Sequence, residues 1–69
     1  MVKNYNVLIK DINNQIIDRY NKNFDTDNLH ENRKKVIENL ILDYKYLGVD
    51  ITKKYNINLL FIEFTEINR

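Results

Sequence analysis

Few residues in this chain could carry out catalysis. It contains no Ser and no Cys, so the aliphatic hydroxyl nucleophiles are Thr26, Thr52 and Thr65. His30 is the one imidazole that could serve them as a base. One His and no Cys also exclude a zinc site of the His/Cys type, and Gly48, the single glycine, excludes a glycine-rich phosphate loop. We therefore expect no catalytic residue, no metal and no cofactor.

Paired carboxylates could still do acid–base chemistry or bind a divalent cation. Asp25-Thr26-Asp27-Asn28 begins like a calcium loop, but Leu29 and His30 stand where an oxygen ligand and the turn glycine belong. We interpret this segment as the start of a helix. On a regular strand Glu63 and Glu66 alternate to opposite faces, so they would not share a site. The third pair of carboxylates considered for acid–base chemistry or cation binding is Asp43 with Asp50.

Composition narrows the class of protein. Eleven Lys and Arg against ten Asp and Glu give a net charge of +1, which favours neither nucleic acid nor an anionic membrane. The longest apolar run, Leu59 to Ile62, is far shorter than the roughly 20 residues of a membrane span. We expect a cytoplasmic protein. Asn, Ile, Lys and Tyr, whose codons are AT-rich, make up about half of the chain, a composition that would suit a phage or mobile element.

The first third of the chain predicts a β-hairpin. Residues 4–10 and 15–21 read as strands joined by the pair Asn13-Asn14, which tolerates the backbone of a two-residue turn. This turn places Val7 opposite Tyr20 and Asp11 opposite Ile16. One face then carries Tyr5, Val7, Ile9, Ile16 and Tyr20, and the other carries Leu8, Ile12 and Ile17.

A helix and a third strand follow. Apolar residues recur at helical spacing over about 26–47, with Asp25 as the N-cap and Gly48 as a left-handed C-cap that folds Val49 back onto Tyr44. After a polar connection, 50–56, the segment 56–67 is apolar on both faces, as expected of a strand that is covered on both sides. The sequence therefore predicts a single small α+β domain, 1–69, of ββαβ type.

Connectivity places the third strand at an edge of the sheet. The strands of a hairpin are neighbours, so the third strand lies beside one of them with its other side free. One helix covers one face, which leaves the opposite face open. If the even-numbered row of the third strand is the uncovered one, the interface residues are Leu60, Ile62, Phe64, Leu8 and Ile17. The alternative is that a curled sheet covers them within one chain.

These features favour a small non-enzymatic protein-binding module. We expect a homodimer in which two copies pair through the third strand or stack their open faces. The sheet edge or open face would dock on a further protein. A phage or mobile-element inhibitor that occludes a host protein or defence complex would fit, an anti-CRISPR-like inhibitor being one example. The alternative is a nucleic-acid-binding regulator that contacts phosphates through Arg33, Lys34, Lys35, Lys53 and Lys54. Acidic residues interrupt this basic set, and we find no helix-turn-helix pattern.

Overall fold

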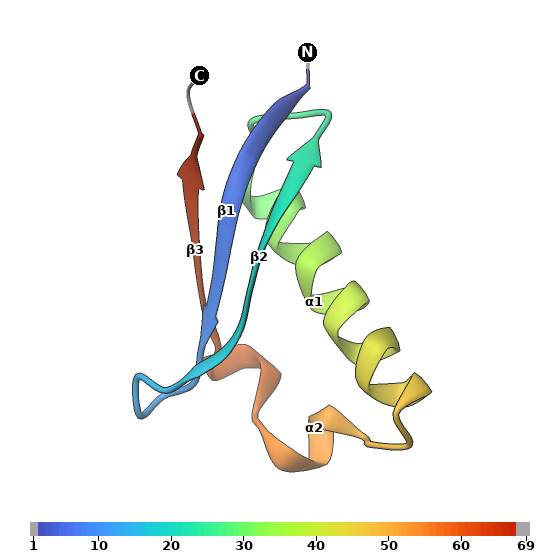
Figure 1. Ribbon diagram of the computed structural model, residues 1–69. Coiled ribbons are helices and arrows are strands. Elements are labelled where there is room, and N and C mark those ends of the chain that lie inside the picture. The colour runs from blue at the N-terminus through green and yellow to red at the C-terminus, as the bar shows by residue number, and fades with distance from the viewer. Residues whose placement is uncertain (1, 68–69) are drawn as a thin grey trace.

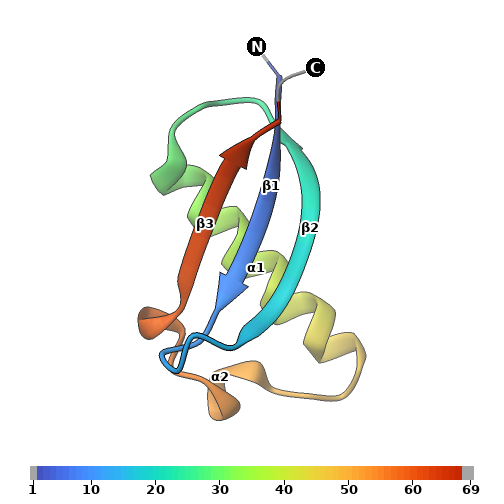
Figure 2. The same ribbon diagram turned by 60° about the vertical axis from the view of Figure 1, so that its left-hand side comes forward.

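A three-stranded antiparallel sheet and one long helix follow one another in the order ββαβ, which confirms the predicted α+β fold. The computed structural model describes residues 2–67. The strands lie in the order β2-β1-β3, and α1 crosses one face of the sheet while the other face stays open (Figures 1 and 2). No helix in this range is long and apolar enough to span a bilayer. The elements are β1 (Lys3–Lys10), β2 (Ile16–Phe24), α1 (Leu29–Tyr46), α2 (Ile51–Lys54), the 3-10 helix η1 (Ile57–Leu59) and β3 (Phe61–Glu66).

The hairpin turns through a longer loop than the predicted Asn13-Asn14 pair. The Asp11 amide donates to the carbonyl of Gln15, and the Asn14 amide donates to the carbonyl of Asp11, each at 3.0 Å. Asn14 adopts a φ of 65°, in the left-handed region that Asn tolerates. The buried Asp11 carboxylate accepts the amides of Asn13 and Gln15 at 2.9 Å. The loop therefore spans 11–15, and the predicted two-residue turn is wrong.

A bulge in β2 reverses the predicted positions of two isoleucines. Val7 lies opposite Tyr20, as predicted, but the register shifts so that Lys10 lies opposite Ile16. An extra residue on one strand inverts the alternation of side chains beyond it. Ile16 therefore lies on the open face and is 60% exposed, whereas Ile17 packs against the core. Both assignments made from the sequence were wrong for this reason.

The third strand lies at an edge beside β1, as the connectivity predicts, but it presents the opposite face to α1. Phe64 lies opposite Val7 and Ile62 opposite Ile9, so the even-numbered row shares the face of the fully buried β1 residues. Leu60, 5% exposed, belongs to the core. The prediction that Leu60, Ile62 and Phe64 form an uncovered row is therefore wrong. The strand is also shorter than predicted, because residues 57–59 form η1.

The helix α1 starts later than predicted and ends as predicted. Its N-cap is Asn28, whose side chain accepts the amides of His30 and Glu31, and not Asp25. At the C-terminus the amide of Gly48, at φ 78°, donates to the Lys45 carbonyl at 3.0 Å. The Val49 amide donates to the carbonyl of Tyr44 at 2.9 Å. These two bonds form a Schellman cap.

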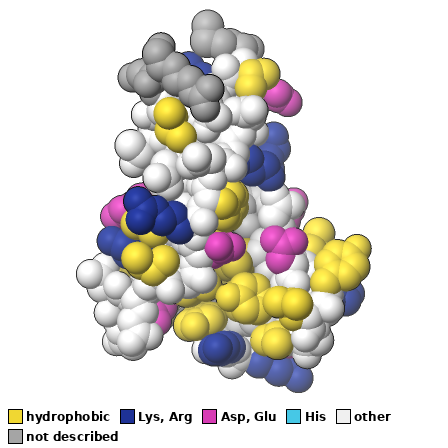
Figure 3. Space-filling view, in the orientation of Figure 1, with side chains coloured by type: hydrophobic (Ala, Val, Ile, Leu, Met, Phe, Trp, Pro, Cys, Tyr) yellow, Lys and Arg dark blue, Asp and Glu magenta, His cyan; other side chains and the backbone are white. Residues whose placement is uncertain are grey.

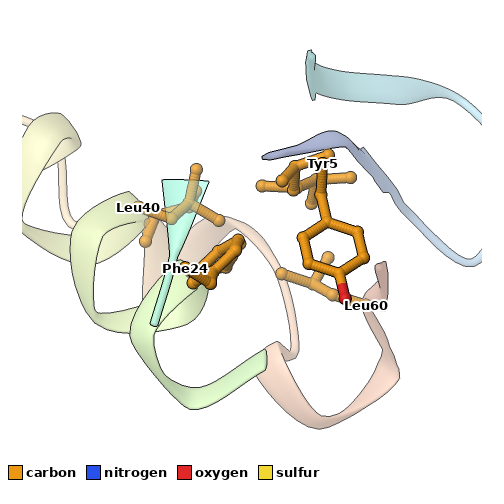
Figure 4. Close-up of a cluster of buried hydrophobic side chains, with 8 residues drawn as sticks. Tyr5, Phe24, Leu40 and Leu60 are labelled. Carbon is orange, nitrogen blue, oxygen red and sulfur yellow. The ribbon is translucent and has the colours of Figure 1, made fainter. Parts of the chain in front are cut away.

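The connection after α1 contributes to the core. The segment predicted as a polar link contains α2, which begins with Ile51, a residue with no exposed surface. Figure 4 shows Tyr5, Phe24, Leu40 and Leu60 converging from β1, β2, α1 and the residue before β3. The rings of Tyr5, Phe24 and Phe64 contact one another with centroids 5.7 to 6.0 Å apart. The buried apolar residues are Tyr5, Val7, Ile9, Phe24, Val36, Leu40, Ile51 and Leu60.

Candidate protein-binding surface

The residues considered for catalysis are engaged in capping or are spread over the fold. The Thr26 hydroxyl accepts the amide of Asn28 at 3.1 Å. The hydroxyl of Thr52 donates to Asp50, the N-cap of α2. Thr65 lies on the open face of the sheet, whereas His30 lies in the first turn of α1, which packs on the opposite face. Across residues 2–67, no three His, Cys, Asp or Glu side chains lie close enough to hold a metal ion.

A polar cleft between β2 and α1 contains the partly buried Tyr20, whose phenol has a raised pKa. The cleft has a volume of about 290 Å³ and is lined by Asp18, Tyr20, Lys22, Asn39 and Asp43. Burial raises the pKa of Tyr20, and the negative charges of Asp18 and Asp43 raise it further. A raised pKa keeps the phenol protonated at neutral pH, which is the opposite of what a tyrosine base requires. The Tyr20 phenol is therefore not poised to accept a proton.

The open face of the sheet is mostly polar, in contrast to the predicted apolar face. Cross-strand partners place four asparagines at the end of the sheet near the start of β1. These are Asn4 opposite Asn23 and Asn6 opposite Asn21, and Thr65 of β3 also lies opposite Asn6. Leu8 lies on this face as predicted, between Glu63 and Arg19. These rows make this part of the open face polar, and within them Asn4 Oδ1 and Asn6 Oδ1 are buried without a hydrogen-bond partner in the described chain.

Apolar side chains on the open side gather where the hairpin loop meets the start of β3. Phe61 is 59% exposed and lies across Lys10 from Ile16. Two pockets of about 240 and 310 Å³ flank Ile12, one reaching Leu59 and the other reaching Phe61. We call Ile12, Ile16, Leu59 and Phe61 the hairpin-end patch.

A second apolar surface lies at the end of α1. Tyr46 is 90% exposed, and Leu42, one turn earlier, lines a shallow pocket with it. Leu47 and Val49 extend this surface into the turn after the helix. Figure 3 shows hydrophobic side chains gathered over the lower part of the molecule, around α2 and the end of α1. We call Leu42, Tyr46, Leu47 and Val49 the helix-end patch.

The two free edges of the sheet differ in their protection. On β2 the bulge interrupts regular pairing, and the charged residues Asp18 and Lys22 lie opposite Ile9 and Tyr5 on the covered side. Bulges and inward-facing charges are common ways to block an edge strand. On β3 the same side carries Ile62 and Phe64 in the middle of the strand, with Glu66 at its end. The β3 edge is therefore the less protected of the two.

The basic residues do not form one continuous surface along α1. Lys34 and Lys35 are exposed in the first half of α1, whereas Lys53 and Lys54 are exposed on α2, which lies past the other end of the helix (Figure 1). Arg33 is partly buried and donates from Nη2 to the carbonyl of Leu60 at 3.3 Å. Its guanidinium thus holds two elements of the fold together.

Comparison with protein-family models, with curated proteins and with solved structures gives no match.

Sequence reasoning missed the hairpin-end patch. It treated Ile16 as core because it could not locate the bulge, and it treated Phe61 as part of a strand covered on both sides. The alternation of odd- and even-numbered residues along β3 could have indicated which side of this strand is exposed. Phe61, Glu63 and Thr65 form a mixed row, while Ile62 and Phe64 form an apolar one. The apolar row is the one that a single helix would cover.

Proposed function

We propose that this protein is a small non-enzymatic binding protein that acts through a protein–protein interface. The interface consists of the hairpin-end patch and the adjoining edge of β3. The observation that carries the proposal is the exposure of Phe61 beside the β3 edge, which has no bulge and carries apolar residues in the middle of its covered side. Aromatic residues are enriched at the cores of interfaces, and free strand edges are sites of pairing with other chains.

The energies involved are sufficient for specific binding. Complete burial of a large apolar side chain stabilises a complex by up to about 1.5 to 3 kcal/mol before the costs of association. The four residues of the hairpin-end patch are each about half exposed or more. Burying them against a partner would contribute several kcal/mol to the free energy of binding. Main-chain hydrogen bonds along β3 would fix the orientation of the partner.

An inhibitor that occludes another protein fits a surface of this kind. Such a protein needs only a stable scaffold and one complementary patch, which a short chain can provide. The AT-rich composition would suit a phage or mobile element, so we propose a host protein or defence complex as the target. Binding would then take place in the host cytoplasm.

We also propose that the protein forms a homodimer, and that the helix-end patch supports it. A dimer with two-fold symmetry uses the same surface on both copies. Tyr46 and Leu47 are the most exposed apolar residues of the described chain. The stretch between Leu42 and Leu47 contains two charged residues, Asp43 and Lys45. Sedimentation should give a dimer that Tyr46→Lys converts to a monomer, with Lys35→Glu as the control on the same helix.

Photo-cross-linking tests the target interface directly. A photoreactive phenylalanine at position 61 should cross-link to a protein in host lysate after nuclease treatment. The same protein should bind the wild-type chain after purification, and Ile16→Lys should weaken binding at least tenfold with the fold retained. Lys35→Glu, away from the patch, should have no effect. In a parallel lysate without nuclease treatment, cross-linking to nucleic acid that is lost on Lys34→Glu and Lys53→Glu would instead establish the nucleic-acid alternative.

A further inference from the structure

The main-chain groups at the free edge of β3 can be assigned residue by residue. In an antiparallel ladder, residues alternate between pairs that exchange hydrogen bonds and pairs that do not. The Ile67 amide donates to the Asn4 carbonyl at 2.9 Å, which makes this a bonded pair. By alternation, Thr65 and Glu63 also direct their amides and carbonyls toward β1. The amides and carbonyls of Ile62, Phe64 and Glu66 therefore point away from the sheet.

We propose that these three residues accept an extended segment of the partner protein as a fourth strand. This inference rests on the proposed function and specifies how the same site recognises its target. Main-chain bonds from Ile62, Phe64 and Glu66 would fix the segment beside β3. One end of it would then reach the hairpin-end patch, because the pocket that contains Phe61 is also lined by Ile62 and Glu63.

The position of α1 favours an extended segment over a second copy of this chain. Figure 2 shows that α1 begins on the β3 side of the sheet and then crosses behind it toward β2. The bond from Arg33 to the Leu60 carbonyl holds the helix there. If two copies joined their β3 edges about a two-fold axis, both helices would lie on one face and their first turns would meet over the shared edge. A lone strand carries no helix of its own into that region.

The side chains around the edge define the chemistry of the segment. On the covered side it would lie beside Ile62 and Phe64, which are partly buried, so its residues there should be apolar. On the open side it would lie beside Glu63, whose side chain is 60% exposed despite its ion pair with Lys10 at 3.9 Å. A Lys or Arg opposite Glu63 would complement that charge. The segment should therefore alternate apolar and basic residues.

The test is a titration of the isotopically labelled full-length chain with two capped heptapeptides. One alternates Val and Lys, and the control alternates Val and Glu. Amide chemical shifts are followed together with hydrogen exchange. We expect the Lys peptide to shift the amides of Ile62, Phe64 and Glu66 and to slow their exchange about tenfold or more. The outward-facing amides of β2 should not change, and the Glu peptide should have at least tenfold weaker effects.

Three results would overturn the proposal. The first is no change at the β3 edge with millimolar Lys peptide, and the second is equal effects of the two peptides. The third is protection of the three amides that rises with protein concentration alone, because a second copy would then occupy the edge. A chemically synthesised chain with an N-methyl group on Phe64 separates this inference from the proposed function. If that chain still binds the cross-linked partner and Ile16→Lys does not, the patch is the interface and strand addition is wrong.

Discussion

Proline substitutions at two adjacent positions of β3 should have very different effects on stability. Proline removes the amide donor, so its cost depends on whether that amide is bonded within the sheet. We infer that the Thr65 amide donates to the Asn6 carbonyl, whereas the Glu66 amide points into solvent. Thr65→Pro should therefore break the β1–β3 ladder, and Glu66→Pro should leave it intact.

The magnitude follows from the groups involved. Thr65→Pro loses one hydrogen bond, worth about 1 kcal/mol, and leaves the Asn6 carbonyl of the central strand unpaired at a further cost of about 1 to 3 kcal/mol. The total of about 2 to 4 kcal/mol is large beside the stability of roughly 3 to 10 kcal/mol expected for a chain of this size. Glu66→Pro loses only an exposed ion pair with Lys3, whose charged atoms are 3.8 Å apart, worth about 0 to 1 kcal/mol.

Urea denaturation followed by circular dichroism measures both effects. Thr65→Ala and Glu66→Ala serve as matched controls, so that each proline is compared with the loss of the side chain alone. We expect Glu66→Pro to unfold within about 0.5 kcal/mol of Glu66→Ala. If Glu66→Pro is as destabilising as Thr65→Pro, the assignment of outward-facing amides is wrong, and the proposed fourth-strand site loses its basis.

Three further predictions concern the caps of the helices. Because Asn28 caps α1, Asn28→Ala should lower the free energy of unfolding, measured in urea, by about 1 kcal/mol. Asp25→Ala should change that free energy by less than about 0.5 kcal/mol. Equal losses would contradict the assignment of Asn28 as the cap. Gly48→Ala should cost about 1 kcal/mol from its φ of 78° alone, since nothing lies within 4 Å of the added Cβ; an unchanged midpoint would show that this turn is not rigid. Hydrogen bonds from Thr52 lower the pKa of Asp50 below its ordinary value of 3.8, so the carboxylate stabilises the native state above that pH and its contribution is lost as the pH falls through the lowered pKa. Acid titration of stability should show this loss in the wild type and not in Asp50→Asn.

The sequence predicted those parts of the fold that depend on local chemistry or on connectivity. Gly48 marks the end of α1 because few other residues adopt its backbone conformation, and the third strand must lie at an edge because the hairpin strands are neighbours. The position of Ile16 could not be predicted. Residues Asp11 to Gln15 permit turns of several lengths, and a change of one residue moves every side chain beyond it to the other face.

The core contribution of Ile51 was also beyond sequence reasoning. It is one apolar residue between Asp50 and Thr52, in a segment too short to show a period. It is buried because α2 packs against α1 and brings Ile51 into the core, which is a tertiary arrangement. The face of β3 that meets α1 was predictable in principle, since one row contains Glu63 and Thr65 and the other does not. For the candidate site, the edge was therefore foreseeable from topology and the exposure of Phe61 from the alternation along β3, whereas the exposure of Ile16 was not.

The strand order has a consequence for how the chain folds. The central strand β1 pairs with β2 through a short loop, but its pairing with β3 joins the two ends of the described chain. Contacts distant in sequence form slowly, because closing a long loop costs entropy before any contact offsets it. A hairpin with one bare side of β1 should therefore precede the native state. Until β3 arrives, that side of β1 offers the same open main-chain groups to any other chain in solution.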